Sequence, residues 1–276
     1  MDITIEQTKD GSNTLYVQEI DEHYHSVKGA LTESQHIFIN CGLKQIDKSN
    51  IDIFEVGFGT GLNAILSLIH GSDKHISYTT IEKYPLQHEV IKDIKYSTIL
   101  NPTEYSLFER LHTSEWNNFV EITPSFTFRK LKADFTAISL IDYYDVIYFD
   151  AFSPEKQPEM WSEEVLKKIY DHLRNQGILV TYCAKGEIRR RMQKIGFVVE
   201  RLAGPPGGKR EILRGTKKIK SDGRPPLFFE INYFLNKFFR LSKKPFFALS
   251  DFGASNLTNF EAGALHTGQI SGALSP

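Results

Sequence analysis

The sequence lacks the features that mark several classes of protein. Its 276 residues include only two cysteines, Cys41 and Cys183, which are too few for a disulfide framework and have no metal-ligand spacing. No apolar run approaches the roughly 18 residues that a membrane helix needs, and the first residues lack the basic and apolar regions of a signal peptide. Lys and Arg (33) nearly balance Asp and Glu (34). We therefore expect a cytoplasmic globular protein with no metal site and no membrane partner.

What the sequence does contain is an alternation of short apolar segments with segments of helical periodicity. Strands are expected over 51–56, 76–81, 144–149 and 178–183, and helices after residue 61, around 159–174 and around 187–194. This alternation predicts a doubly wound α/β fold with a mostly parallel sheet. The segments 197–202 and 210–213 flank a Gly-Pro-Pro-Gly-Gly turn and predict an antiparallel end to that sheet.

The same patterns divide the chain into three parts. Residues 51–215 form the main domain, and residues 1–50 are expected to be a small extension that packs on it, with a hairpin and a short helix from Thr32. Residues 216–276 are expected to be a basic and aromatic stretch followed by a weakly structured tail, since 246–276 contain no Lys or Arg. The basic stretch could bind RNA or form a helix packed on the domain.

The clearest chemical motif is Glu55-Val-Gly57-Phe-Gly59-Thr-Gly61-Leu-Asn63, which joins a strand to a helix. Glycines let a ligand approach the backbone, and a helix amino terminus offers unpaired N–H groups. Glu82 follows Gly61 by 21 residues and ends the next strand, where a carboxylate can accept hydrogen bonds from both ribose hydroxyls of an adenosine cofactor. A tight strand–helix turn alone also favours glycine, but three glycines with the acid favour the cofactor.

The details of this motif distinguish between adenosine cofactors. The last glycine interval is one residue shorter than in the dinucleotide fingerprint. The negative charge of Glu55 would repel a pyrophosphate but attract the sulfonium and ammonium groups of S-adenosylmethionine (SAM). The motif therefore predicts SAM rather than NAD.

A second motif, Asp150-Ala-Phe152-Ser-Pro154, follows the strand expected at 144–149. Ligands bind at this end of an open parallel sheet. Asp150 could orient an amine or take its proton, and Phe152 could stack on a base or face a cation. The motif resembles the Asp/Asn-Pro-Pro-aromatic loop of amino-group methyltransferases, with Ala151 in place of a proline. The alternative is an aspartate that caps a helix beside a phenylalanine of the core.

Several motifs in order resemble one known family. They are Gly57–Asn63, Ile81–Leu86, Phe149–Pro154 with Pro158–Trp161, Gly208–Glu211, and a lead-in from Asp21–Ser26 through Glu33–Phe38. Together they resemble the bacterial tRNA 5-methylaminomethyl-2-thiouridine methyltransferases over residues 15–215. That family comprises stand-alone MnmD-type proteins and the amino-terminal half of the bifunctional MnmC. The resemblance implies a class I SAM-dependent methyltransferase fold with a Rossmann-like, seven-stranded sheet. It also implies methylation of the amine of 5-aminomethyl(-2-thio)uridine at the tRNA wobble position.

The resemblance also implies roles for individual residues. The methionine end of SAM would be lined by Glu55, Gly57, Gly59 and Asn63, with Gly61 and Asp150 also among the cofactor residues. Glu82 would hold the ribose, and Asp134 would meet the adenine amino group unless it is a solvated loop aspartate. Asp150 and Phe152 would be the catalytic residues that frame the acceptor. Lys209 and Arg210 would face RNA phosphate, or simply form a charged strand end.

Other functions remain open at this point. The bifunctional relatives carry an FAD-dependent domain, but no glycine fingerprint follows residue 215, so we expect SAM and tRNA without FAD. The alternatives are another SAM-dependent N-methyltransferase, an enzyme that makes polyamines from decarboxylated SAM, and a non-catalytic RNA-binding relative. His23, His25 and His36 are expected to be surface or packing residues, although the lead-in with Tyr24 and His25 could cover the cofactor.

Overall fold

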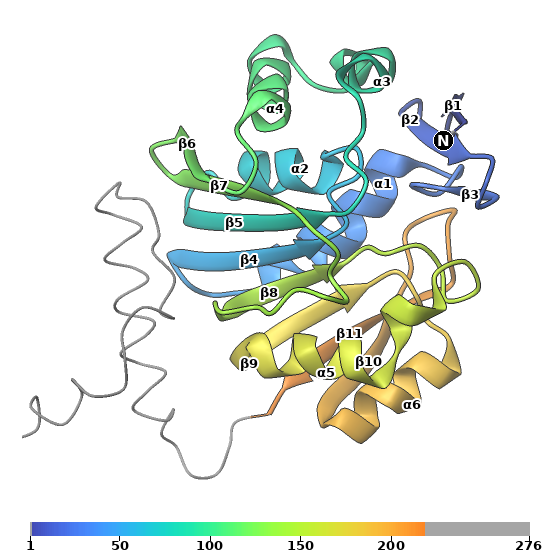
Figure 1. Cartoon of the computed structure of the whole chain (residues 1–276), viewed down its shortest axis with the longest axis vertical. Coiled ribbons are helices and arrows are strands. Elements are labelled where there is room, and N and C mark those ends of the chain that lie inside the picture. The colour runs from blue at the N-terminus through green and yellow to red at the C-terminus, as the bar shows by residue number, and fades with distance from the viewer. Residues whose placement is uncertain (1, 219–276) are drawn as a thin grey trace, which may run out of the picture. The chain divides into compact units, whose positions relative to one another are not determined.

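The computed structural model describes residues 2–218, and a sheet of eight strands lies at their centre (Figure 1). The strand order is β10-β11-β9-β8-β4-β5-β7-β6. The five central strands β9, β8, β4, β5 and β7 run parallel to one another. Their bounds are Leu173–Thr181, Tyr144–Phe149, Asn50–Val56, His75–Glu82 and Phe126–Lys132. This confirms the predicted α/β fold with a mostly parallel sheet.

The two edges of the sheet are antiparallel. One edge is the predicted pair β10 (Phe197–Ala203) and β11 (Glu211–Lys217). The other is β6 (Phe119–Thr123), which forms a hairpin with β7. The expected number of seven strands is therefore wrong. Sequence reasoning gave no range for β7, and it also missed β6. It is short and only Ile122 in it is buried, so it shows little of the apolar pattern that reveals a central strand.

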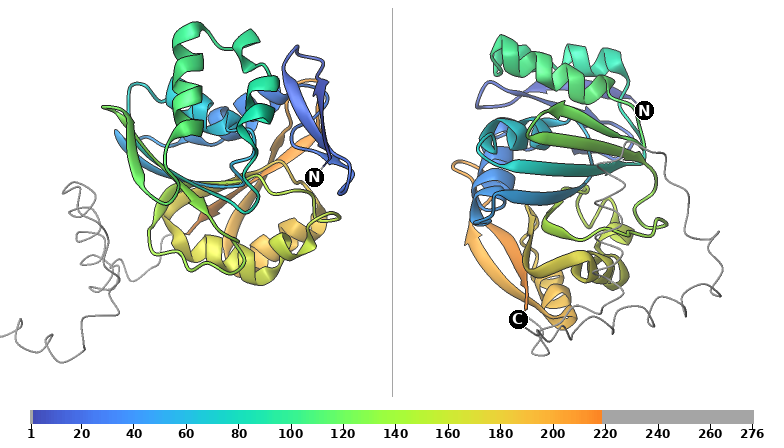
Figure 2. Two further views of the ribbon diagram at one scale, coloured as in Figure 1. Left: turned by 45° about the horizontal axis from the view of Figure 1, so that its top comes forward. Right: turned by 90° about the vertical axis from the view of Figure 1, so that its left-hand side faces the viewer.

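Helices cover both faces of the sheet (Figure 2). On one face α2 (Leu62–His70), α4 (Pro102–Thr113) and a π-helical turn, η1 (Gln35–Asn40), contribute to one apolar core. On the other face α5 (Glu163–His172) and α6 (Gly186–Ile195) form a second core. The helix expected around 159–174 thus consists of a 3-10 turn, η4 (Pro158–Trp161), and α5. It ends earlier than expected because Leu173 already pairs with Tyr144 in the sheet.

The first fifty residues form a small three-stranded antiparallel sheet and short helical segments. The predicted hairpin is β1 (Ile3–Gln7) with β2 (Asn13–Val17), to which β3 (Glu22–His23) adds a third strand. The expected short helix is α1 (Ala30–Ser34). Leu15 and Phe38 are buried in the same core as α2. The domain boundaries remain predictions, and most of the predicted tail, residues 219–276, lies outside the described residues.

Three shorter segments complete the described fold. They are α3 (His88–Asp93), the 3-10 turn η3 (Tyr96–Thr98), and a further 3-10 turn, η2 (Leu43–Gln45), which precedes β4. Across residues 2–218, none of the helices combines the length and the apolar character needed to span a membrane.

Candidate functional site

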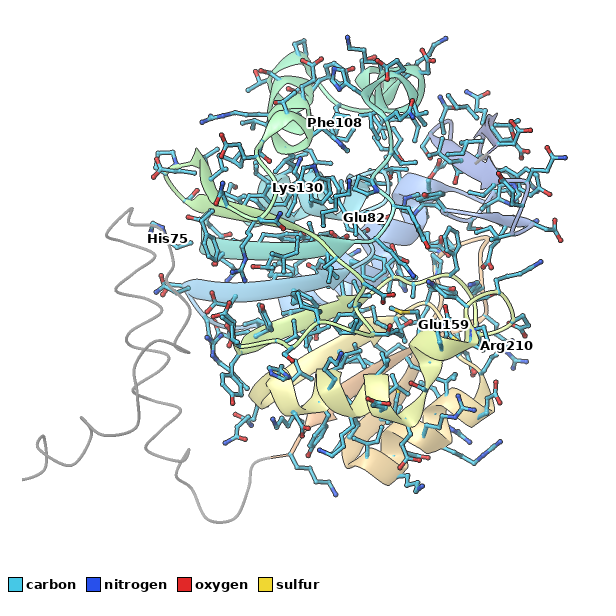
Figure 3. The ribbon with its side chains drawn as sticks, viewed as in Figure 1. His75, Glu82, Phe108, Lys130, Glu159 and Arg210 are labelled. Carbon is cyan, nitrogen blue, oxygen red and sulfur yellow. The ribbon has the colours of Figure 1, made fainter. Side chains whose placement is uncertain are left out.

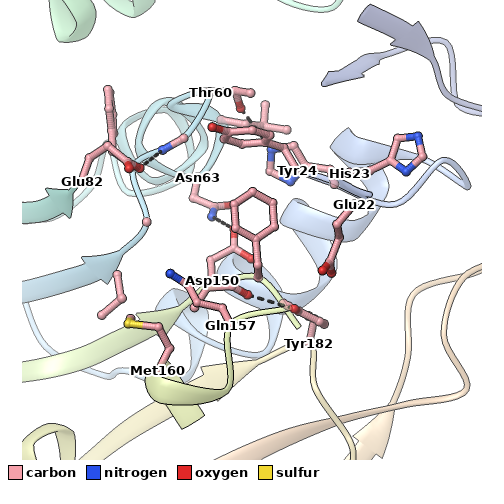
Figure 4. Close-up of a pocket in the computed structure, with 18 of the residues that line it drawn as sticks. Glu22, His23, Tyr24, Thr60, Asn63, Glu82, Asp150, Gln157, Met160 and Tyr182 are labelled. Atoms are coloured by element: carbon pink, nitrogen blue, oxygen red, sulfur yellow. Dashed lines mark hydrogen bonds between the residues drawn. The ribbon is translucent and has the colours of Figure 1, made fainter. Parts of the chain in front are cut away.

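A pocket of about 350 Å³ opens at the edge where the parallel strands end. Segments that follow five of these strands contribute to its wall, because the carboxyl ends of parallel strands meet at one edge of a sheet. They place Gly57, Glu82, Asp134, Asp150 and Tyr182 around the pocket, and Figure 4 shows three of these side chains. The sequence motifs that follow β4, β5 and β8 are thereby brought together.

The glycines after β4 leave space that side chains would fill. Gly57 has φ +91°, and a Cβ atom there would lie 2.8 Å from the carbonyl oxygen of Asp150. Gly59 has φ +48°, and its Cβ would lie 2.9 Å from the ring of Tyr24. Both conformations favour glycine, so the backbone of this loop forms an open wall of the pocket. Gly61 caps the start of α2 and is not among the residues that line the pocket.

Two carboxylates lie on the β5 and β7 side of the pocket. The Oε2 atom of Glu82 accepts a hydrogen bond from the N–H of Gly59 (3.1 Å), and its Oε1 atom accepts one from the N–H of Tyr84 (2.9 Å). Asp134 forms an ion pair with Lys83 (2.8 Å). The hydrogen bond from Lys83, helped by bonds from Thr136, lowers the pKa of Asp134 to about 2. Glu82 is therefore fixed against the glycine loop, and Asp134 stays ionised.

Asp150 lies on the β8 side of the pocket, next to α2. The side-chain Nδ2 of Asn63 donates a hydrogen bond of 2.8 Å to Oδ2 of Asp150 (Figure 4). Burial raises the pKa of Asp150 to about 7, although this hydrogen bond opposes the shift. A carboxylate with this pKa can both accept and release a proton near neutral pH. Phe152 follows in the same loop, and its ring meets that of Tyr24 edge-on with 5.3 Å between centroids.

Glu55 lies behind the pocket wall rather than on it. Its side chain is fully buried, and it is not among the lining residues. Thr80, Asn63 and Tyr78 are close, but neither carboxylate oxygen makes a hydrogen bond with a described residue within the usual geometric limits. Burial, reinforced by the charge of Asp150, raises the pKa of Glu55 to about 8. Its expected contact with the methionine end of SAM stays a prediction.

The lead-in before α1 forms the opposite wall, and sequence reasoning only suggested it as a cover. Oε2 of Glu22 accepts a hydrogen bond of 2.8 Å from the hydroxyl of Ser153. The ring of His25 forms a hydrogen bond of 3.0 Å with the hydroxyl of Thr60 in the glycine loop. The lead-in is thus fastened to both the Asp150 loop and the glycine loop. The cluster of polar residues at 21–26 was the one feature of the sequence that could have pointed to this wall. No local pattern connected these residues with the pocket.

The other histidines of that group have ordinary partners. His23 pairs with Glu6 at 3.0 Å, and the ring of His36 bonds the carbonyl of Ala203 at 2.8 Å. His23 also lines the pocket. No group of three or more His, Cys, Asp or Glu with the geometry of a metal site occurs in residues 2–218.

The two basic residues predicted to face RNA are placed differently. The ammonium of Lys209 lies 3.6 Å from the centroid of the Tyr182 ring and lines the pocket. The hydroxyl of Tyr182 in turn donates to the carbonyl of Ala151 at 2.9 Å. Arg210 is exposed and does not line the pocket (Figure 3). Tyr182 was missed, although its position directly after β9 follows the same rule that located Asp150.

Comparisons with known proteins agree with this geometry. Residues 113–218 match the family described as S-adenosyl-L-methionine-dependent methyltransferase. A relative from Marinomonas sp. is 30% identical over 216 residues, which cover 71% of this chain and 31% of the relative. One from Actinobacillus pleuropneumoniae is 27% identical over 240 residues, covering 78% and 35%. Both are named tRNA 5-methylaminomethyl-2-thiouridine biosynthesis bifunctional protein MnmC. The chain spans about a third of the length of these curated relatives.

A solved structure shows the same fold. The crystal structure of MnmC2 from Aquifex aeolicus superposes with a TM-score of 0.63 at 22% identity, covering 88% of this chain and 86% of that one. This likeness confirms the expected class I methyltransferase fold, and the sequence relatives confirm the resemblance noted in the motifs. The chain therefore belongs to the S-adenosyl-L-methionine-dependent methyltransferases, in the family that it shares with the matched part of the bifunctional MnmC proteins.

Proposed function

We propose that this methyltransferase transfers the methyl group of SAM to the amine of 5-aminomethyl(-2-thio)uridine at the wobble position of tRNA. The observation that carries the proposal is Asp150, held by Asn63 in the same pocket as the glycine loop and Glu82. The names of the relatives point to the acceptor, since both refer to tRNA 5-methylaminomethyl-2-thiouridine biosynthesis. The macromolecular partner would then be tRNA, and the cytoplasm would be the compartment.

The residues present fit SAM. Glu82 offers a fixed carboxylate for the ribose hydroxyls, and the positive-φ glycines leave room for the cofactor. Asp134 lies on the same side as Glu82 and would receive the adenine amino group. Asn63 and Asp150 would adjoin the methionine end. Bound there, SAM supplies a methyl group on a positively charged sulfur.

Asp150 then has two tasks toward the acceptor. The amine must lose a proton before its lone pair can attack, and Asp150 would accept that proton and orient the nitrogen. The new bond joins this nitrogen to the methyl carbon, while the carbon–sulfur bond breaks and its electron pair stays on sulfur. Alignment and exclusion of water by Tyr24 and Phe152 would supply much of the remaining rate enhancement.

The assignment of Glu82 to the ribose predicts a loss of cofactor affinity. Glu82→Ala should weaken SAM binding by about 1.5–3 kcal/mol, the scale of hydrogen bonds to a charged acceptor. Titration calorimetry measures this directly. Glu89→Ala, at an exposed position of α3, is the matched control and should bind SAM like the original protein. Equal affinities in both variants would remove Glu82 from the cofactor site.

The choice of acceptor is tested with purified protein, SAM and two tRNAs, without added FAD. Methylaminomethyluridine should form from tRNA that carries the free aminomethyl group. The carboxymethylaminomethyl form should not react, because its amine is already substituted and its extra carboxylate would be repelled by Asp150 in a partly desolvated site. Nucleoside mass spectrometry of the digested tRNAs gives the answer. Equal conversion of both tRNAs, or conversion of neither, would contradict the proposed function.

A further inference from the structure

Glu33 is a pocket residue to which the proposed function assigns no task. It belongs to α1, is 8% exposed, and lines the pocket with Asp150. Its Oε2 atom accepts a hydrogen bond of 2.8 Å from the N–H of Ser26 in the lead-in. Within residues 2–218, no cation forms an ion pair with it. Burial raises the pKa of this carboxyl, while the hydrogen bond from Ser26 and the charge of Lys209 oppose the shift and favour the ionised form.

The surroundings of Glu33 are the acceptor end of the pocket. Glu33 lines this pocket together with Asp150, Tyr182 and Lys209, so its charge interacts with all three groups. The Lys209 ammonium, held over the Tyr182 ring, also acts on Asp150 but with the opposite sign. The titratable groups that interact electrostatically around Asp150 come from six parts of the fold: Glu22 of β3, Glu33 of α1, Glu55 of β4, Tyr78 of β5, Tyr182 and Cys183 after β9, and Lys209 between β10 and β11.

We propose that Glu33 is a specificity-determining residue of the acceptor end. Its negative charge attracts a positively charged primary amine to Asp150 and makes Asp150 a better proton acceptor, while Lys209 moderates both effects. This inference rests on the proposed function, since it concerns the same amine. It adds a reason why a cationic acceptor is preferred over an anionic one. Carboxylates outnumber ammonium groups in the pocket lining, which contains Glu22, Glu33, Glu82, Asp134 and Asp150 beside Lys83 and Lys209.

The two charges predict opposite changes in the pH dependence of activity. Asp150 must be ionised to accept a proton, so the acid limb of kcat/KM follows its pKa. A neighbouring anion raises the pKa of a carboxyl, and a neighbouring cation lowers it. Loss of the charge of Glu33 should therefore move the acid limb to lower pH. Loss of the charge of Lys209 should move it to higher pH.

The test compares Glu33→Gln and Lys209→Gln in the full chain. Glutamine keeps an oxygen that can accept the hydrogen bond from Ser26, so Glu33→Gln removes the charge while preserving the link to the lead-in. We expect limb shifts of about half a pH unit in opposite directions. We also expect Glu33→Gln to raise KM for aminomethyl tRNA about fivefold with unchanged SAM affinity. Glu109→Gln, on an exposed position of α4 outside the pocket, is the control and should match the original protein.

A second readout makes the test independent of turnover. The carboxyl carbon of Asp150 is titrated by NMR in the SAM-free protein and in both variants, and its pKa should fall in Glu33→Gln and rise in Lys209→Gln. Shifts in one common direction, or none, in both readouts would overturn this inference even if the aminomethyl tRNA is methylated. A protein that methylates neither tRNA but shows the opposite NMR shifts would instead refute the proposed function and retain the charge relation.

Discussion

Asp150→Ala is expected to reduce methyl transfer by about 100-fold or more, the range for loss of a general base, with a much smaller change in SAM affinity. The reason lies in the placement of the carboxylate. Only Asn63 donates a hydrogen bond to it among the described side chains, and Asp150 lines the pocket. Single-turnover rates and calorimetry with SAM separate the two effects.

Asp150→Asn is the matched variant. Asparagine can still accept the hydrogen bond from Asn63, so it preserves the loop while removing the proton acceptor. It should therefore bind SAM like the original protein and be nearly as inactive as Asp150→Ala. If both variants lose SAM affinity to the same extent as turnover, Asp150 is a cofactor or structural residue and another group accepts the proton.

Trp161→Ala is expected to lower the free energy of unfolding by about 3–5 kcal/mol, the range for truncation of a buried aromatic side chain. Trp161 is fully buried, and its ring meets that of Phe149 edge-on with 4.7 Å between centroids. Its Nε1 donates a hydrogen bond of 2.7 Å to the carbonyl of Phe152. The residue therefore supports both the second core and the loop that carries Asp150. Urea denaturation followed by circular dichroism measures the loss.

Trp161→Phe separates these two roles. Phenylalanine retains much of the packing but cannot donate to Phe152, so we expect a smaller loss of stability with a clear fall in methyl transfer. A variant as active as the original protein would show that the hydrogen bond to Phe152 does not position the Asp150 loop. A Trp161→Ala protein of unchanged stability would contradict the burial argument itself.

The central strands β4, β5, β8 and β9 and the glycine loop could be predicted because their signals are local. Residues 144–149 are all buried in β8, and the continuous apolar centre of this segment indicates burial directly in the sequence. Gly57 and Gly59 occupy positions that disfavour other residues. The edge strand β6 gave no such signal, since it is half-exposed and takes its pairing from β7. The end of α5 also depended on the sheet, through the pairing of Leu173.

Residues that line the pocket could be predicted only where the order of strands along the chain determines their position. Glu82 and Asp150 follow parallel strands, so one rule about strand ends places them together. Glu22 reaches the pocket through a bond with Ser153 that joins residues 131 positions apart, and nothing near Glu22 in the sequence indicates such a partner. Glu33 is bonded to Ser26, only 7 positions away, but nothing near it in the sequence indicates that it lines the pocket. For Lys209, the charge suggested an RNA contact, but the turn between β10 and β11 brings the ammonium onto Tyr182.

Folding is coupled to protonation of the buried carboxyl of Glu55. Its pKa is about 8 in the folded protein against an ordinary value of 4.5, so between these pH values the folded chain holds a proton that the unfolded chain releases. Stability from this group is fully present below pH 4.5 and is lost progressively as the pH rises to about 8. At neutral pH, folding therefore takes up a proton at Glu55. Raising the pH lowers the free energy of unfolding through this group.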